Sequence, residues 1–406
     1  MKRLTAIWLC ALAMLPMAAH AQLTMQMSNG WSFSFAGNVN VFWVYTKEDS
    51  NGTAGSQASN SSIRTGLLPA FATFDAKGKE AGLNLGVHFG FAPQVNNAGV
   101  HDNFGNGTQA GAQIDMRQIF MTVGGNFGQF LVGRELGLFG RQNILNDQTL
   151  YGVGSVGIGG GQGGGTTLGR IGYGYIYPNF NAQVTYSTKS GRPMQLSVGL
   201  FQPSVVLSSV GGNSYNFTPL PRLEAEATYN AKGGKNKFLI WGGGVAQNAS
   251  NAATDGHSIT SVGGTAGVRA DISSLSIVLS GYVGKGLGTL LMFSGIGGGG
   301  ISSNDSIARP SDGGYLQVGF GLSKKTTIAA SAGLSRLKNA DSGEAGGANG
   351  GPNTLRTQLT SYTAGLYNQW TKSVRLTVEV TQEHQQGIAT PNASQWDISG
   401  GILLFY

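Results

Sequence analysis

The sequence predicts an all-β fold, a transmembrane antiparallel β-barrel of sixteen strands, and three observations support this prediction. Apolar and polar residues alternate in many segments, as in strands with one oily and one wet face. These segments are joined alternately by short turns and by long loops. Glycine makes up 67 of 406 residues and charged residues only 11%, a composition that does not favour helices.

The N-terminus predicts a cleaved signal peptide at residues 1–21. Two basic residues precede an apolar run at 4–17, and small residues at 19 and 21 mark the cleavage site. The run is shorter than the roughly 20 residues that a membrane-spanning helix needs. We therefore expect an exported chain whose barrel covers residues 22–406. Cys10 lies inside the signal peptide, so no thiol is expected in the mature chain.

The alternation begins at Trp31 and continues to Tyr45, with apolar residues at odd positions and small or polar residues at most even positions. It returns later in the chain, around Arg222 and around Arg375. An arginine on the lipid face near the membrane midplane costs roughly 2–4 kcal/mol, so these side chains are expected to face the lumen. The predicted pore-wall residues are Asp115, Arg222, Glu224, Glu226, Arg375 and Glu379.

The connections between these segments fix the expected strand count and the positions of the termini. Even numbers of strands, short periplasmic turns and long extracellular loops are typical of bacterial barrels, so both termini are expected on the periplasmic side. A soluble β-sandwich also alternates, but its strands recur at a closer spacing of about 8–12 residues. The predicted short turns are 77–82, 124–128, 189–193, 232–236, 271–274, 324–327 and 371–373. The predicted long loops are 47–62, 94–113, 135–169, 204–220, 248–258, 286–313, 339–353 and 386–394.

The segment from Arg170 to Ser187 allows two interpretations. The pair Pro178-Asn179 could form a hairpin turn, or it could mark a bulge within one strand. A turn would give seventeen strands and break the even count, so we expect one long strand here.

Six short motifs follow one another along the mature chain. They are Met116-Arg117-Gln118, Asn126-Phe127-Gly128, Val132-Gly133-Arg134, Gly169-Arg170, Tyr177-Pro178-Asn179-Phe180 and the terminal Tyr406. In their order and spacing they resemble the Gram-negative trimeric porin family, the general porins found especially in β-proteobacteria. The resemblance implies a homotrimer, and a third loop that folds into the lumen and narrows the pore. This chain departs from the family in having few acids in that loop and a glycine-rich run at 159–165.

The resemblance also implies a set of constriction residues around the third loop. Arginines outnumber acids in this set, and a narrow passage magnifies such a local excess, so we predict a mild anion preference. The alternative is that these arginines only pair with acids and hold the loop. The formal net charge of +7 does not decide the matter, because many of the bases lie in short turns. The predicted constriction residues are Arg117, Arg134, Glu135, Arg141, Asp147 and Arg170.

The C-terminus predicts an assembly signal. Phe405 and Tyr406 end an alternating segment that runs back to Trp396. Barrels that resemble this family end in an aromatic residue that the barrel-assembly machinery recognises. The alternative is a C-terminal strand that is merely packed.

Motifs for chemistry are weak or absent. The glycine-rich run lacks the lysine and hydroxyl ending of a phosphate-binding loop, and the mature histidines lack metal-ligand spacing. No serine lies in a nucleophile-elbow motif. We therefore expect no catalytic residue, no metal and no cofactor, and a protein that is not an enzyme.

Sixteen tilted strands enclose an aqueous channel, so the sequence predicts passive diffusion of small hydrophilic solutes and ions. The expected location is the outer membrane of a Gram-negative cell. Expected partners are outer-membrane lipid, periplasmic chaperones and the barrel-assembly machinery, with no nucleic acid. Two alternatives remain open, a substrate-selective channel for organic anions and an outer-membrane barrel enzyme or adhesin.

Overall fold

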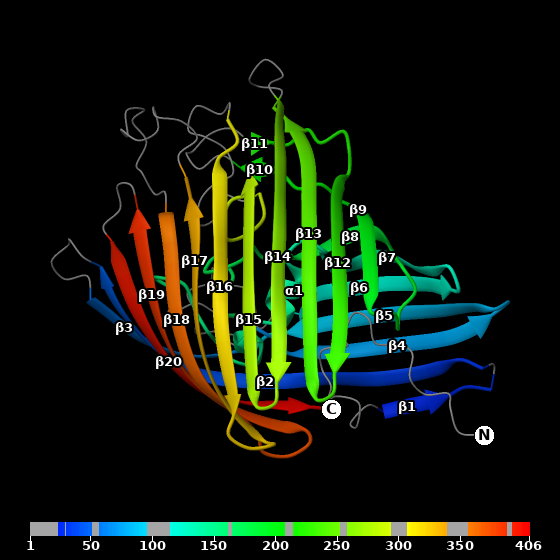
Figure 1. Ribbon diagram of the computed structural model, residues 1–406, viewed down its shortest axis with the longest axis horizontal. Coiled ribbons are helices and arrows are strands. Elements are labelled where there is room, and N and C mark those ends of the chain that lie inside the picture. Colours follow the sequence, from blue (N-terminus) through cyan, green and yellow to red (C-terminus); the bar gives the residue numbers. More distant parts are fainter. Residues whose placement is uncertain are drawn as a thin grey trace, which may run out of the picture.

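The computed structural model confirms a closed antiparallel β-barrel with sixteen strand positions (Figure 1). The last strand pairs with the second, from Asn38 opposite Phe405 to Ser50 opposite Ala393, which closes the sheet. The predicted signal peptide and residues 161–164 of the glycine-rich run lie outside the described residues. The structure describes residues 23–28, 30–50, 57–95, 114–160, 165–207, 214–251, 258–293, 307–338, 356–387 and 392–406.

The strands of the barrel follow one another in chain order, and each pairs with its neighbours. They are β1 (Leu23–Gln26), β2 (Ser32–Ser50), β3 (Gln57–Arg64), β4 (Phe71–Glu80), β5 (Leu83–Pro93), β6 (Ile114–Gly125), β7 (Gly128–Leu136), β8 (Phe180–Ser187), β9 (Met194–Phe201), β12 (Arg222–Gly233), β13 (Asn236–Ser250), β14 (Ser258–Ile272), β15 (Leu275–Lys285), β16 (Pro310–Gly321), β17 (Thr326–Leu337), β18 (Arg356–Gln369), β19 (Val374–Gly387) and β20 (Ala393–Phe405). Two short strands, β10 (Val206–Leu207) and β11 (Ser214–Tyr215), pair only with each other.

Two strand positions are shared between segments. β3 and β4 pair with successive halves of the same edge of β2, so together they occupy one position that is interrupted at residues 65–70. β1 pairs with the first residues of β2, beyond the point where the pairing of β20 with β2 ends. The sheet therefore contains more strand segments than the sixteen positions of the barrel.

All seven predicted short turns are confirmed, and they connect antiparallel neighbours at one end of the barrel, here named the short-turn end. In the β4–β5 turn, Ala81 and Gly82 have φ angles of 47° and 81°. Two successive left-handed residues are the geometry that follows the twist of a tight hairpin. The opposite end is here named the long-loop end.

The predicted alternation of faces is confirmed on β2. Val39 and Trp43 are 46% and 48% exposed on the outer face, whereas Asn38 and Asn40 are buried on the inner face. Phe42 lies on the inner face although it is apolar, and it is buried. It packs against residues of the long connection between β7 and β8, which explains an inward apolar side chain.

That connection is the third of the long loops, residues 137–179, here named the third loop. It contains the helix α1 (Arg141–Leu145) and the 3₁₀ helix η2 (Gln148–Tyr151). In Figure 1, α1 is drawn behind β13 and β14. Among the described residues, no helix is long and apolar enough to cross a membrane.

The prediction of one long strand from Arg170 to Ser187 is wrong, because β8 begins only at Phe180. Tyr173 and Tyr175 imitate a strand pattern, but both are buried, at 1% and 0% exposure. The glycines between and before them take positive φ angles, and Asn179 has a φ of 54°. The backbone therefore turns repeatedly, and the alternation reflects packing within the third loop.

Two predicted loop boundaries are also corrected. β2 continues to Ser50 and β3 begins at Gln57, so the first loop is shorter than the predicted 47–62. β16 begins at Pro310, before the predicted end of the loop at 313. In both places polar or glycine residues continue a strand, because ladder hydrogen bonds need no particular side chain.

Candidate functional site

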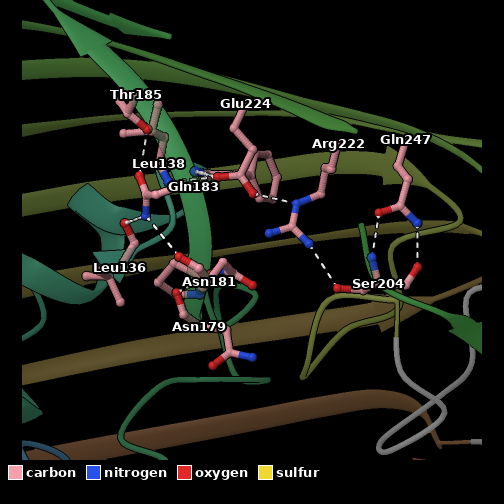
Figure 2. Close-up of polar contacts among 12 residues, drawn as sticks. Leu136, Leu138, Asn179, Asn181, Gln183, Thr185, Ser204, Arg222, Glu224 and Gln247 are labelled. Carbon is pink, nitrogen blue, oxygen red and sulfur yellow. Dashed lines mark hydrogen bonds and ion pairs between the residues drawn. The ribbon is translucent and has the colours of Figure 1, made fainter. Parts of the chain in front are cut away.

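Inward-facing carboxylates of β12 hold the start of the third loop. Glu224 accepts hydrogen bonds from the backbone N–H groups of Leu138 and Phe139, at 2.7 and 2.9 Å. Its other oxygen accepts from Nε of Arg222 at 2.8 Å, and the carboxylate is fully buried. Figure 2 shows Glu224 between Leu138 and Arg222, with Arg222 reaching onward to Ser204. Hydrogen bonds to an ionised group are about twice as strong as neutral ones, so this is a firm attachment.

A second carboxylate on β12 holds α1. Glu226 forms an ion pair with Arg141 and accepts a hydrogen bond from Nε2 of Gln142 at 3.2 Å. The next residue of the helix, Asn143, accepts from Nε1 of Trp241 at 2.8 Å. The start of the third loop is thus fixed to β12 and β13 together.

Inward carboxylates of β19 hold the middle of the third loop. Glu379 accepts from the N–H groups of Val153 and Gly154 at 2.6 and 2.8 Å, and from the Tyr367 hydroxyl at 2.5 Å. Four residues further along β19, Glu383 accepts from the N–H groups of residues 156 and 157 at 2.9 and 3.3 Å. The third loop therefore joins two well-separated regions of the barrel wall.

The end of the third loop is attached through Arg170, which is fully buried. Its Nε donates to the hydroxyl of Ser331 at 3.0 Å, and one terminal nitrogen donates to the hydroxyl of Ser361 at 3.2 Å. Asp147 is also buried and accepts from the Thr149 N–H at 2.9 Å and the Tyr175 hydroxyl at 2.8 Å. Burial raises the pKa of the Asp147 carboxyl, and the positive charge of Arg170 opposes that shift.

Arg375 contacts the third loop from the short-turn half of β19. Its guanidinium lies 4.1 Å from the ring centroid of Tyr151, a cation–π contact, and its Nε donates to the side chain of Gln369 at 3.0 Å. Among the residues that the structure describes, Arg375 forms no ion pair with a carboxylate. Four predicted pore-wall residues thus contact the third loop from the inner face, namely Glu224, Glu226, Arg375 and Glu379.

Glu135 ends an inward-facing row of polar side chains on β4 to β7. It accepts a hydrogen bond from Nε2 of Gln118 at 2.8 Å, and Gln118 lies 3.4 Å from Nε2 of His88. The other ring nitrogen of His88 lies 3.0 Å from Asp75. Sequence reasoning missed His88, Gln118 and Asp75, for which the only available signal was the alternation of faces.

The structure corrects the assignment of Arg134 to the constriction. The strand register places Arg134 beside Ile119 on β6 and Ala182 on β8, and Ile119 is 40% exposed on the outer face. Arg134 therefore does not share the inner face with its neighbour Glu135. A shift of one residue along a strand exchanges the two faces, and a short motif does not fix that register.

Arg117 and Asp115 lie together at the long-loop end of β6. Asp115 is opposite the buried Ala92, and its carboxylate accepts from Nε of Arg117 at 2.9 Å. Arg117 falls at an irregularity in the pairing of β5 with β6, and its guanidinium lies 5.7 Å from the ring centroid of Phe180. The structure therefore distributes the predicted constriction residues over several separate contacts.

Apolar clusters accompany these polar attachments and were not predicted. One of them joins Phe139 and Ile176 of the third loop to wall residues of β13 to β15, and it includes Leu287 and Phe293 from the loop after β15. Leu287 and Phe293 are both fully buried. The start of that loop is tied to the third loop, because the Tyr177 N–H donates to the carbonyl of Leu290 at 2.9 Å. Two long loops thus pack together against the inner face of the wall.

The described residues hold no group of three or more His, Cys, Asp or Glu side chains that could bind a metal ion. The inward carboxylates are instead occupied by backbone N–H groups and by arginines. This arrangement can position a loop and set the charge of a passage.

An antiparallel barrel of sixteen positions, apolar outside and polar within, defines a membrane-spanning pore protein of the outer membrane. A family model described as "Gram-negative porin" matches residues 8–387, nearly the whole chain. The chain belongs to the Gram-negative porin family. Family and fold point to a channel rather than an enzyme. No curated protein matches the sequence.

Solved structures of outer-membrane proteins share the fold. The outer-membrane channel DcaP of Acinetobacter baumannii aligns with a TM-score of 0.68 at 14% identity, over 94% of this chain and 99% of that one. An anion-selective porin from Comamonas acidovorans aligns with a TM-score of 0.62 at 13% identity, over 93% and 100%. The trimer form of OmpT from Vibrio cholerae aligns with a TM-score of 0.50 at 14% identity, over 93% and 100%.

Proposed function

We propose that the protein is a water-filled channel for passive diffusion of small hydrophilic solutes and ions, and that its third loop lies in the lumen and forms the constriction. One observation carries this proposal. The third loop is bound through its backbone to inward carboxylates of both β12 and β19. A segment attached to two separate parts of the inner wall narrows the space between them.

The proposed channel has a mild anion preference. Arg141 is paired with Glu226, and Arg117 with Asp115, so these arginines add little net charge. Inward-facing positions at the short-turn end, however, hold more bases than acids in the described part of the chain. The bases are Lys77, Lys79, Lys232, Lys237, Arg269 and Arg375, and the acids are Asp75 and Asp271. The anion-selective relative from Comamonas supports the same direction.

Planar-bilayer measurements test both parts of the proposal. A size series of neutral sugars added to both sides reports the width of the constriction, and the reversal potential in a salt gradient reports the charge selectivity. We expect anions to permeate faster than cations, and the variant Arg375→Gln to reduce that ratio. Lys324→Gln, in the exposed turn between β16 and β17, is the matched control. Clear cation selectivity of the native channel would contradict the anion preference.

The alternative of a substrate-selective channel predicts a different result in the same experiment. One organic anion would block the current in a saturable manner, whereas a general diffusion channel responds to size and charge alone. Block by a single compound at low concentration therefore favours the selective channel.

We also propose a homotrimer, a cleaved signal peptide at residues 1–21 and a C-terminal assembly signal at Phe405 and Tyr406. The trimer form of a structural relative supports the first. Support for the last comes from the position of Tyr406, whose N–H donates to the carbonyl of Gly37 at 3.0 Å where the barrel closes. N-terminal sequencing of the protein from outer membranes and crosslinking of the assembled protein test these assignments.

A further inference from the structure

A cluster of charged side chains lies at the long-loop end of β15, β16 and β17. Arg336 is opposite Asp312 in the pairing of β17 with β16. Lys285 is opposite Pro310 on the other side of β16, and the Lys338 N–H bonds to the Pro310 carbonyl at 2.9 Å. The cationic patch, defined as Lys285, Arg336 and Lys338, thus surrounds Asp312 on three adjacent strands.

The strand register places this patch on the outer surface of the barrel. Asp312 is opposite Val283, which is 64% exposed, and it shares its face with Leu316, which is 48% exposed. The neighbouring residues Ser311 and Leu337 are only 1% and 3% exposed, so they face inward. The charges therefore lie at the rim of the surface that contacts lipid.

The cations are held in place and still accessible. Nε of Arg336 donates to Asp312 at 2.7 Å, and the Lys338 ammonium forms an ion pair with the same carboxylate. The side chains of Arg336 and Lys338 are nevertheless 50% and 54% exposed. Among the described residues, Asp312 is the acid that pairs with these bases. One acid cannot neutralise three bases, so this part of the structure keeps a net positive charge and donors that face away from the barrel.

An apolar stripe continues from the patch along the outer face of β15 and β16. Its residues are Leu279, Val283, Leu316, Val318 and Phe320, which are 40% to 64% exposed. A surface with fixed cations at the membrane rim and exposed hydrocarbon below it matches an anionic lipid, with a headgroup at one end and acyl chains at the other. Neither a free anion nor a soluble protein would need the apolar stripe.

We propose that the cationic patch binds the phosphate of an outer-leaflet lipid headgroup, and that the acyl chains of this lipid lie along the apolar stripe. The free-energy cost of placing a cation on the outer face of the barrel also favours this site. A cation on the outer face is tolerated only near the interface, where anionic headgroups lie. Each cation near such a surface strengthens binding by about fivefold.

The test measures how much phosphorylated lipid the purified full-length barrel retains. The native protein and the double variant R336Q/K338Q are incubated with phosphatidylcholine vesicles with and without diphosphorylated lipid A, and bound lipid is counted by native mass spectrometry. We expect the double variant to retain at least about fivefold less lipid A. K232Q/K235Q, which removes the same charge at a short turn, is expected to match the native protein.

Two further arms separate this proposal from its rivals. Inorganic phosphate alone is expected not to bind. If the native protein bound inorganic phosphate as tightly as lipid A, the lipid assignment would be overturned. Asp312→Asn leaves three cations unopposed and is expected to raise lipid A retention. If the charges only join β16 to β17, D312N will not raise retention, and the double variant will retain as much lipid as the native protein; either result overturns the proposal. Circular dichroism verifies that each variant is folded.

Discussion

Glu379 accepts the shortest of the backbone hydrogen bonds that hold the middle of the third loop. It accepts two backbone N–H groups and the Tyr367 hydroxyl while almost fully buried. We predict that Glu379→Gln weakens this attachment by about 1.5–3 kcal/mol, because the hydrogen bonds lose a charged acceptor. A less restrained loop should give larger and noisier single-channel currents in planar bilayers.

The control for that experiment is Glu80→Gln at the β4–β5 turn, which removes an equal charge from an exposed position. It should leave both the current and its noise unchanged. If Glu379→Gln also behaves like the native channel, then the third loop does not depend on this carboxylate.

The inward positions of β12 and β19 could be predicted from alternation, but the partners of their side chains could not. Glu224 and Glu379 were assigned to the lumen from alternation alone, and the register agrees. Their partners lie in the third loop, on the order of a hundred residues or more away along the chain, so no local pattern connects them. Arg134 was misassigned because a three-residue motif does not tell which face a strand position takes.

At the scale of elements, backbone strain in the tight turns can be tested. Ala81 has a φ of 47°, a left-handed conformation that a residue with a Cβ adopts reluctantly. In Ala81→Gly the relief of backbone strain stabilises the folded state, whereas the greater freedom of glycine stabilises the unfolded chain. We predict that the first effect is larger, and that the variant stabilises the β4–β5 hairpin by about 0.4–1 kcal/mol net. Urea unfolding in lipid vesicles measures the change. Ala81→Val should shift the midpoint in the opposite direction.

At Gly152 the third loop makes a contact that only glycine permits. A Cβ added at Gly152 would lie 2.1 Å from an oxygen of Glu379, which is itself held by three hydrogen bonds. We predict that Gly152→Ala displaces the loop from β19 and changes the single-channel conductance in the same direction as Glu379→Gln. Gly400→Ala, where a Cβ would meet nothing within 4 Å, is the matched control. Identical currents from both variants would contradict the prediction.

Strands and short turns could be predicted from the sequence because period-two alternation and turn residues are local signals. The third loop could not, since its course depends on distant contacts. Tyr173, Gly174 and Tyr175 have the alternation of a strand, yet they fold as a compact segment against the wall. The inward packing of Leu287 and Phe293 was missed for the same reason.

At the scale of the whole molecule, the barrel inverts the usual arrangement of a soluble protein. Large apolar residues are exposed on the outer face, and buried positions inside are largely polar. The near-zero mean hydropathy of −0.04 averages these two faces. Such a molecule should tolerate a new charge on its outer face according to depth in the membrane, because only the middle of the barrel meets hydrocarbon.

Leu279 and Thr260 test that expectation at two depths. Leu279 lies in the middle of β15 and is 54% exposed, while Thr260 lies near the long-loop end of β14 on the same outer face, between the buried Ile259 and Ser261. We predict that Leu279→Arg lowers the free energy of unfolding by about 2–4 kcal/mol and Thr260→Arg by about 0–1 kcal/mol. Urea unfolding in phospholipid vesicles gives both values. Equal effects at the two sites would mean that the middle of this face is not in contact with hydrocarbon, because depth alone distinguishes an arginine that reaches the headgroups from one that does not.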